Sequence, residues 1–514
     1  MLPVVFFAVF LVYPLIALGR VALTEETWET VLSAGPWEIA GLATAQSLAS
    51  VFLSLILGVP IAGVLSRYLF PGRTLVWALV TVPFVLPTVV VALGFQSLLG
   101  GFLDPGILLV VLAHAYINIA VVVRVVGAKW SSILPQQRLI AQSLGATPWH
   151  VFRTVTLPLL RPSLLAASCI VFVFSFTSLG IVVILGDGTS TRTLEQSILR
   201  QTSVLLNFPG ALASAILQVV VVSLALLIAA RTGGAMVPTR AGNTQLAHSL
   251  STPRNRGQKL AIAAVILSTV VMIAAPIYSI VWDSIAARGN ATLQWWTALP
   301  TLTTTFAGVG SPLEAVLTSV VIALVTALIA ALIGGATAIA VMGRNPFLAF
   351  MTLIPLGLSA ATVGLGTLLA FGRPPFDLRA TGLLIPLAHS LVAIPLVVAI
   401  AAPVLRSADP RRLIVASSLG APPSRAWWTA YGSLIRTVML AAGGLAGAVS
   451  LGEFGAASFL ARADTPTIPL QIAKLLSKPG EQAYATAAVL SVLLIAATMA
   501  LMIWVDRLNN RART

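Results

Sequence analysis

Few residues in this chain have a type and spacing that could do chemistry. Its 514 residues include one cysteine, four histidines and 15 acidic residues. Cys169 lies in an apolar run and has no second cysteine to pair with, so we interpret it as an inert buried thiol. The sequence contains neither a Ser/His/Asp arrangement nor a cluster with metal-ligand spacing. A membrane-embedded enzyme is therefore a weak hypothesis.

Three ionisable residues lie in or beside apolar segments and are candidates for a solute pathway: Glu453, His114 and His389. A carboxylate within a membrane is costly to bury unpaired, and such residues are often functional. Glu453 could equally lie at an outer membrane boundary, because Arg462 and Asp464 follow it closely. For the two histidines, packing at a helix interface is a commoner role than binding a cation.

A short polar element occurs twice. Ser143-Leu144-Gly145-Ala146 returns in the second half of the chain as Ser418-Leu419-Gly420-Ala421. Around the first copy, apolar residues fall at helical spacing, and Gly145 and Pro148 interrupt them, which predicts two short helices at an angle. A kinked helix pair suits a groove on a soluble partner, so we interpret both copies as docking surfaces.

An ATP site would require a phosphate-binding loop, in which Gly-Lys precedes Ser or Thr. Glycine precedes none of the four lysines, which are Lys129, Lys259, Lys474 and Lys478. We therefore expect no ATP hydrolysis by this chain, and no cofactor of its own.

The elements that position these residues are predicted to be transmembrane helices. Hydrophobic residues make up 58% of the chain and charged residues 9%, and the mean hydropathy is +0.99. Apolar runs long enough to cross a bilayer recur along the sequence. The predicted spans lie near 2–19, 43–66, 75–99, 106–128, 162–185, 208–230, 259–283, 315–342, 347–371, 381–405, 434–456 and 484–505. The fold class is an all-α integral membrane protein with about 12 transmembrane helices, the first of them uncleaved.

The two halves of the chain repeat one design. Leu112-Ala113-His114 matches Leu387-Ala388-His389 at an offset of 275, and Ser178-Leu179-Gly180 matches Ser450-Leu451-Gly452 at 272. Near-constant offsets indicate a duplicated unit. We predict two tandem parallel six-helix repeats, with a first domain at 1–230, a polar linker at 231–258 and a second domain at 259–514. A solute path between such repeats is the natural arrangement.

The chain has a formal net charge of +15, and its charged residues are divided unequally between the two predicted sides of the membrane. The loops that carry the repeated element, together with the C-terminal tail, hold most of the basic residues and only Asp409 and Asp506 among the acids. This bias predicts that those loops and the C-terminus face the cytoplasm. A contiguous basic face on a soluble domain is absent, which argues against nucleic-acid binding.

The repeated element resembles the EAA loop of binding-protein-dependent ABC importer permeases, and the resemblance extends over both halves. It is closest to the fused two-domain permeases of thiamine and ferric-iron importers. Supporting pieces are Phe70-Pro71-Gly72-Arg73, Ser450 to Gly455 and Thr467-Ile468-Pro469-Leu470. Leu139 and Ile414 replace the family's glutamate, and Ser433 replaces its second proline, so docking would depend on apolar contacts and nearby arginines. The implied docking residues are Ala141, Ser143, Leu144, Gly145, Ala146, Phe152 and Pro158 in the first copy, and Ala416, Ser418, Leu419, Gly420, Ala421 and Trp427 in the second.

The resemblance implies a type I importer permease in a bacterial inner membrane. Its partners would be a cytoplasmic ABC ATPase homodimer, which binds ATP and magnesium, and an extracytoplasmic solute-binding protein. A small solute such as a thiamine-like cation or ferric iron is favoured, while sulfate, molybdate and polyamines stay open. The alternative is a 12-helix secondary active transporter, which would explain the repeat. Ion-coupled carriers usually place ionisable residues within their spans, and this chain has very few.

Overall fold

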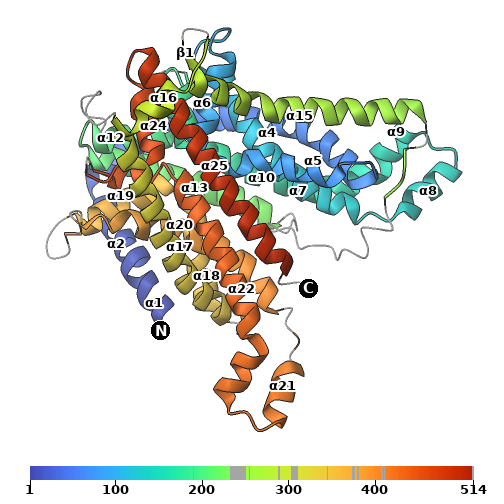
Figure 1. The fold of residues 1–514 in the computed structure, drawn as a ribbon. Helices are drawn as coiled ribbons and strands as arrows, with labels where there is room; N and C mark the ends of the chain where they lie inside the picture. Colours follow the sequence, from blue (N-terminus) through green and yellow to red (C-terminus); the bar gives the residue numbers. More distant parts are fainter. Residues whose placement is uncertain are drawn as a thin grey trace. The chain divides into compact units, whose positions relative to one another are not determined.

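The computed structural model describes residues 1–188, 190–231, 250–253, 255–287, 290–301, 311–343, 345–372, 377–378, 381–406, 409, 411–462 and 464–511, and most of the predicted 231–258 linker lies outside them. Within the described residues the secondary-structure elements are helices, apart from a short hairpin of β1 (Ala286–Ala287) and β2 (Asn290–Ala291) (Figure 1). The helices that precede the linker are α1 (Leu2–Phe7), η1 (Ala8–Val12), α2 (Tyr13–Ala22), α3 (Glu25–Leu32), α4 (Ala34–Arg67), α5 (Arg73–Val85), α6 (Thr88–Leu99), α7 (Ile107–Ser131), α8 (Pro135–Ser143), α9 (Pro148–Val151), η2 (Phe152–Thr156), α10 (Leu157–Phe176), α11 (Leu179–Leu185), α12 (Leu194–Ser203) and α13 (Phe208–Arg231). Those that follow it are α15 (Arg256–Ile285), α16 (Gln294–Ala298), η3 (Leu299–Thr301), α17 (Pro312–Met342), α18 (Pro346–Gly357), α19 (Ala360–Phe371), α20 (Leu384–Arg406), α21 (Arg411–Ser418), α22 (Pro423–Gly452), α23 (Ala457–Leu460), α24 (Ile468–Leu476) and α25 (Glu481–Arg511).

The predicted helical membrane architecture is confirmed. Within the described residues, ten helices are long and apolar enough to cross a membrane, and two bent helix pairs bring the number to as many as 12. The predicted spans at 75–99 and 347–371 are each a pair of helices bent by 102°, which is a broken span or a re-entrant loop. In the first pair the extended Leu86 and Pro87 separate α5 from α6, since proline cannot continue the hydrogen-bond ladder. In the second, the Ser359 side chain accepts the Thr362 N–H and starts a new helix.

The chain folds into two compact units that do not follow the sequence order. One unit contains Met1–Leu32, Ser197–Ala215 and Asp283–Thr514, and the other contains Ser33–Gln196 and Ile216–Trp282. The first helices of the chain thus belong with the second repeat, and most of α15 belongs with the first. The predicted domain limits describe the duplication in the sequence, whereas these units describe how the duplicated pieces pack.

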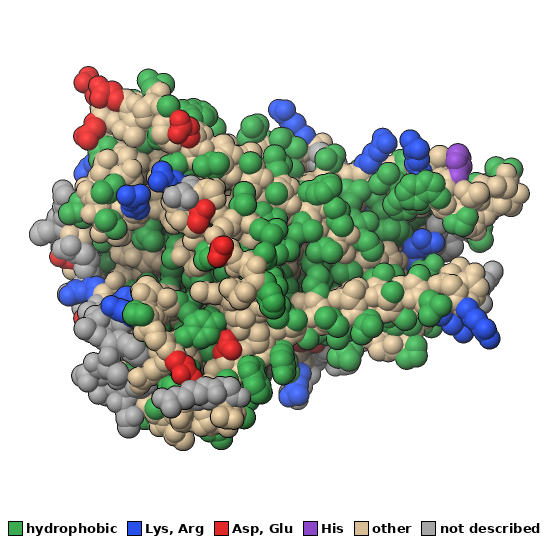
Figure 2. All heavy atoms as spheres, turned by 90° about the horizontal axis from the view of Figure 1, so that it is seen from above, with side chains coloured by type: hydrophobic (Ala, Val, Ile, Leu, Met, Phe, Trp, Pro, Cys, Tyr) green, Lys and Arg blue, Asp and Glu red, His purple; other side chains and the backbone are tan. Residues whose placement is uncertain are grey.

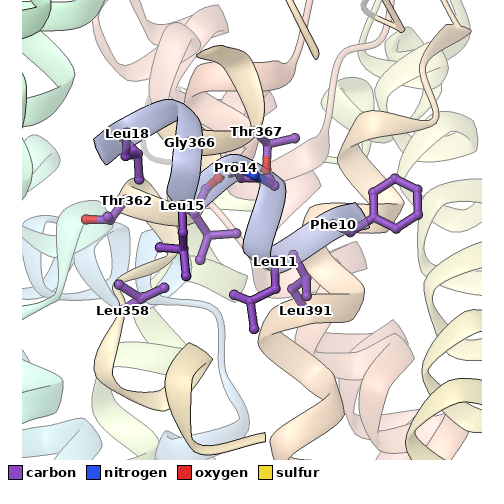
Figure 3. A pocket seen from close by; sticks show the side chains of 11 residues that line it. Phe10, Leu11, Pro14, Leu15, Leu18, Leu358, Thr362, Gly366, Thr367 and Leu391 are labelled. Carbon is purple, nitrogen blue, oxygen red and sulfur yellow. Dashed lines mark hydrogen bonds between the residues drawn. The ribbon is translucent and has the colours of Figure 1, made fainter. Parts of the chain in front are cut away.

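Close packing of α2 on α19 explains why the N-terminal helices join the second repeat. A Cβ added at Gly366 would lie 2.9 Å from Leu18 Cδ1, so the glycine lets the two helices approach closely. Phe371 adds ring contacts with Phe10 at 5.6 Å and Tyr13 at 5.5 Å. Leu11, Leu15 and Leu391 face the same apolar space (Figure 3). The cavity left there is about 10 Å³, too small for a solute.

Helix α15 packs on α6 in the corresponding way within the other unit. A Cβ added at Gly94 would lie 2.9 Å from the Pro276 carbonyl oxygen and 3.1 Å from Ile280 Cδ1. Ser279 Oγ donates to the Gly94 carbonyl at 3.1 Å, and Tyr116 Oη donates to the Ile273 carbonyl at 3.0 Å. Gly94 and Gly366 hold the same position in the two repeats. Each repeat therefore presents the same glycine to the first helix of the other repeat.

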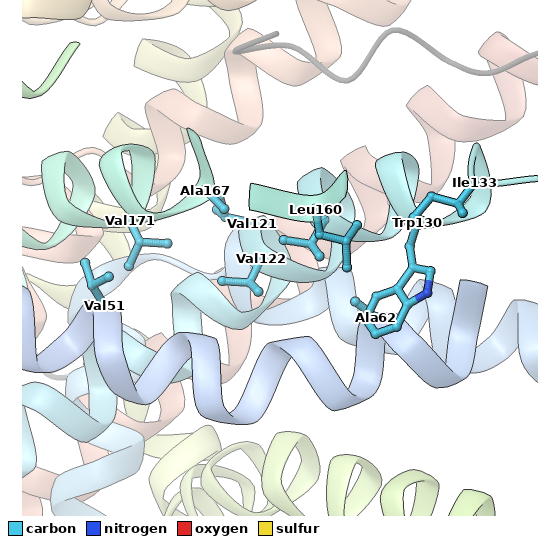
Figure 4. Close-up of a cluster of buried hydrophobic side chains, with 10 residues drawn as sticks. Val51, Ala62, Val121, Val122, Trp130, Ile133, Leu160, Ala167 and Val171 are labelled. Atoms are coloured by element: carbon cyan, nitrogen blue, oxygen red, sulfur yellow. The ribbon is translucent and has the colours of Figure 1, made fainter. Parts of the chain in front are cut away.

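The core of each repeat uses a second matched glycine contact. A Cβ at Gly58 of α4 would lie 2.7 Å from Val122 of α7, and a Cβ at Gly334 of α17 would lie 2.7 Å from Val397 of α20. Val122 belongs to a cluster of ten buried apolar side chains, nine of them from α4, α7 and α10 and the tenth Ile133 just after α7 (Figure 4). This cluster anchors the helices that lead into and out of the first repeated element.

Candidate functional site

The first repeated element forms two helices joined by a tight turn. Helix α8 ends in a Schellman motif: Gly145 has a φ of +85°, its N–H donates to Gln142, and the Ala146 N–H donates to Ala141. The next helix begins at once, because the Thr147 side chain accepts the His150 N–H at 3.3 Å. The predicted turn between two helices is present, but only the helix before it is short, because the helix after it runs on from Pro148 to Phe176.

The second element repeats this geometry bond for bond. Gly420 has a φ of +81°, its N–H donates to Ser417, and the Ala421 N–H donates to Ala416. Every donor and acceptor in this turn is the repeat mate of its counterpart in the first element. Pro422 replaces the capping Thr147, and α22 begins at Pro423. We call the segments 135–151 and 411–426 the first and second docking loops.

The tips of both docking loops expose apolar side chains. Leu144 and Leu419 are each 82% exposed, and Leu139, Ile140, Ile414 and Val415 are also exposed. Ser143 and Ser418 are exposed beside them, whereas Ala416 is buried. An exposed apolar ridge at a polar turn is a feature of binding surfaces. Figure 1 shows α8 lying beyond the end of α7, and α21 beside the N-terminal turns of α22.

Phe152 and Trp427 stand at matched positions but lie deeper than the loop tips. Phe152 is partly buried and packs on the core cluster, with ring centroids 6.1 Å from Trp130 and 5.6 Å from Trp149. Trp427 is partly buried against Trp428 at 5.4 Å and Tyr431 at 5.9 Å. These aromatic residues join the docking loops to the transmembrane helices. Trp149 and Trp428 are exposed beside them and were missed in the sequence, although tryptophan is enriched at binding surfaces.

The two docking loops differ in how they continue into the membrane. After the first loop, the π-helical turn η2 (Phe152–Thr156) precedes Pro158, the second residue of α10. Proline has no N–H to donate, and π-turns are a known accommodation in such places. In the second repeat Ser433 takes that position, and α22 runs unbroken from Pro423 to Gly452. The departure from the family pattern noted in the sequence therefore coincides with an uninterrupted helix.

The first docking loop encloses a shallow open groove. It is lined by Ala141, Leu144, Gly145, Ala146, Thr147, His150 and Thr154. Arg153 is exposed beside it, as are Arg411, Arg412 and Arg425 around the second loop, while the Arg138 side chain lies outside the described part of the chain. In Figure 2 the charged side chains in view toward the α8–α9 end are Lys, Arg and His, and green apolar side chains cover much of the face beside them.

Glu453 and His389 lie together in the second repeat. Glu453 is 8% exposed and His389 is 1% exposed. Nε2 of His389 lies 3.1 Å from Oε2 of Glu453, without the geometry of a hydrogen bond. The carboxylate also accepts the backbone N–H groups of Ala456 and Ala457 at 3.0 and 3.2 Å. Glu453 thus has partners on two sides. A role for the pair in a solute pathway stays a prediction.

His114 has the matching place in the first repeat but different surroundings. It is 1% exposed, and within the described residues neither of its ring nitrogens has a hydrogen-bond partner. Its neighbour Asn118 donates to the His114 carbonyl at 2.9 Å and to Ser175 Oγ at 3.2 Å. The counterpart of Glu453 is Ile181. The sequence suggested two equivalent histidines, but in the described structure His389 has a carboxylate beside it and His114 does not.

Comparison with known proteins identifies the family. The model of the binding-protein-dependent transport system inner membrane component family matches residues 50–234. The thiamine transport system permease protein ThiP of Brucella abortus is 31% identical over 273 residues, 49% of each chain, and that of Escherichia coli is 26% identical over 266 residues, 48% of this chain and 49% of the relative. The aligned region thus spans about half the length of these relatives. The sulfate transport system permease protein CysT of Escherichia coli is 33% identical over 218 residues, 39% of this chain and 77% of the relative. The chain is a multi-pass membrane protein that belongs to the family of binding-protein-dependent transport system inner membrane components.

Proposed function

We propose that the chain is the permease subunit of an ABC importer and forms the membrane pathway for a small solute. The observation that carries this proposal is the pair of docking loops. Two turns with the same glycine cap and the same exposed leucine, one in each repeat, are better explained by one partner surface used twice than by two unrelated loops. Family membership supports the same conclusion.

The partner that fits two equivalent loops is a homodimer of a cytoplasmic ATPase, because a homodimer offers the same groove twice. It would bind ATP and magnesium, since the lysines of this chain lack the P-loop pattern. The docking loops and the C-terminus would face the cytoplasm of a bacterial cell, and a solute-binding protein would deliver the solute to the other side of the inner membrane. Opening and closing of the ATPase dimer would move the two loops and alternate access to the pathway.

The resemblance to thiamine and ferric-iron permeases favours a thiamine-like cation, with ferric iron second. The sulfate permease among the relatives adds sulfate as a further possibility. The two candidate cations and the anion are distinguished by the binding protein that stimulates the complex. A binding protein loaded with the right solute stimulates ATP hydrolysis, whereas the others leave it at its basal rate. A secondary carrier would give no such stimulation.

Co-purification tests the proposal. The tagged chain is expressed with its candidate ATPase as wild type and as the Leu144→Asp/Leu419→Asp double variant. Both leucines are exposed, so the substitutions leave the transmembrane packing unchanged and place negative charge on the apolar tips. Leu293→Asp, at an exposed leucine outside the docking loops, is the control. We expect wild type and control to retain the ATPase and the double variant to lose it. Full retention by a folded double variant would overturn the docking assignment.

A further inference from the structure

Each docking loop sits at the end of a pair of long helices, and the two pairs differ in one buried contact. The second pair, α20 and α22, flanks α21, and we call these three helices the second arm. The first pair, α7 and α10, flanks α8, α9 and η2, and we call this set the first arm. In each arm the repeated histidine lies near the end of the helix that is far from the docking loop. Along α20, His389 lies about 25 Å from the helix end at Arg406.

In the second arm a chain of polar contacts joins the helices at that far end. His389 Nδ1 lies 2.8 Å from Ser450 Oγ on α22, and Ser450 donates to Thr326 Oγ1 on α17 at 3.2 Å. Because Ser450 uses its hydrogen on Thr326, Nδ1 of His389 is the donor to Ser450. Nε2 then faces the Glu453 carboxylate at 3.1 Å. All four side chains are buried.

Glu453 extends this contact beyond α22. It is the first residue after α22, and its carboxylate accepts the N–H groups at the start of α23. The same side chain thus fixes three elements: it ends α22, caps α23 and contacts α20 through His389. Gly455 lies against it, since an added Cβ there would be 3.2 Å from Glu453 Oε1. A buried carboxylate held in this way is strongly destabilised if a partner leaves, because a buried unpaired charge is costly.

The first arm has a neutral contact at the same level, and its exit helix contains a π-turn. Ile181 stands in place of Glu453, and near His114 the neutral pair of Asn118 and Ser175 joins α7 to α10. The exit helix is interrupted by the π-turn η2, whereas α22 is continuous over 30 residues. Sharp helix bends occur at π-turns and at a few other identifiable features, and rarely elsewhere.

We propose that Glu453 and His389 form a buried polar clamp that makes the second arm move as one rigid lever, while the first arm bends at η2. Glu453 is then a positioning residue that acts through His389 and the α23 amides. The clamp gives the second docking loop a direct mechanical connection to the far end of its repeat. The two docking loops therefore bind alike but transmit motion differently. This inference rests on the proposed function only where it concerns coupling to ATP hydrolysis.

Spin-label distances test the rigidity without any partner. In a Cys169→Ser background, nitroxide labels at Leu419→Cys and Arg462→Cys, both exposed, report on the second arm from docking loop to far end. Labels at Leu144→Cys and Ser190→Cys, also exposed, report on the first arm. We expect Glu453→Ala to broaden the 419–462 distance distribution and to leave the 144–190 distribution as it was. Glu453→Gln, which keeps the acceptor for the α23 amides but loses the charge, should give an intermediate width.

Two results would overturn the clamp: an unchanged 419–462 width in Glu453→Ala, or equal broadening of both pairs, which indicates general loosening. If Glu453→Ala does not fold, the Gln variant and Ser450→Ala carry the same comparison.

A second readout concerns coupling in the complete complex in nanodiscs. We expect the Glu453→Ala complex to keep the ATPase bound in normal amount. The stimulation of ATP hydrolysis by the binding protein should fall on the order of fivefold, which is the lower end of usual coupling effects. Wild-type stimulation in that variant would contradict the lever. Loss of the ATPase from the wild-type chain would instead refute the proposed function, and the distance measurements would still decide the clamp.

Discussion

Gly145 and Gly420 adopt the same left-handed backbone conformation, with φ values of +85° and +81°. Each closes a helix by the same pair of backbone hydrogen bonds beside an exposed leucine. Nothing lies within 4 Å of a Cβ built at either glycine. The constraint at these positions is therefore the backbone conformation, which side chains other than glycine and asparagine adopt at a cost.

This relationship predicts a graded response at Gly145 and Gly420. Alanine at either position should cost about 1 kcal/mol of local turn stability, and asparagine less, because asparagine tolerates the left-handed region. We expect the affinity for the ATPase to fall in the order glycine, asparagine, alanine, with the thermal unfolding midpoint of the chain in detergent almost unchanged. Equal affinity of all three variants would show that the turn geometry is not what the partner recognises.

Substitutions at Phe152 and Leu144 should have different effects, the first on the stability of the chain and the second on binding of the ATPase. Phe152 packs on the cluster around Trp130, so Phe152→Ala should lower the free energy of unfolding by roughly 2 kcal/mol, about half the loss at a fully buried site. Leu144→Ala removes an exposed side chain and should weaken ATPase binding while stability is kept. Thermal unfolding and ATPase titration of both variants test this. A stable Phe152→Ala chain that loses the ATPase would move Phe152 to the docking surface.

Gly58 should be sensitive to a single added methyl group. Its Cβ would lie 2.7 Å from Val122 Cγ1, so Gly58→Ala forces α4 and α7 apart and should cost on the order of 1–3 kcal/mol. Gly41→Ala on the same helix has open space and is the matched control. Unfolding midpoints of the two variants in one detergent give the comparison. A midpoint equal to that of the control would mean that the helices can separate freely.

Gly366 should hold the N-terminal helices on the second repeat. Gly366→Val places atoms against Leu18 and Pro14, whereas Gly19→Val on α2 meets nothing within 4 Å. We expect Gly366→Val alone to increase protease cleavage in the segment between α2 and α4 and to lower the unfolding midpoint. If both valine variants behave like wild type, the packing of α2 on α19 is not needed for stability.

The sequence predicted the membrane class, the repeat and the kinked docking loops, because each depends on local features: apolar run length, constant spacing and a glycine followed by proline. The exchange of first helices was not predicted. Gly94 and Gly366 were recognised as repeat mates, but a glycine in an apolar run does not reveal which distant helix approaches it. Pro87 and Pro355 predict kinks inside the spans at 75–99 and 347–371, but not bends of 102°, since hydropathy averages over both helices of a bent pair.

The contact between Glu453 and His389 could not be predicted from the sequence either. Glu453 and His389 were both singled out, but as separate candidates, since they lie in different predicted spans and their repeat mates, Ile181 and His114, are not a charge pair. The contact between them depends on how α20 and α22 pack, which the hydrophobic pattern does not specify. A carboxylate present in one repeat and absent in the other was the signal that could have suggested an asymmetric role.

An ATPase titration against four forms of the chain in nanodiscs decides whether both docking loops bind the partner. The forms are wild type, Leu144→Asp, Leu419→Asp and the double variant. Two docking loops that bind one homodimer predict that each single variant weakens binding and that the double variant abolishes it, with Leu293→Asp equal to wild type. Dual docking is contradicted if the double variant binds as wild type does, or if one single variant abolishes binding and the other has no effect.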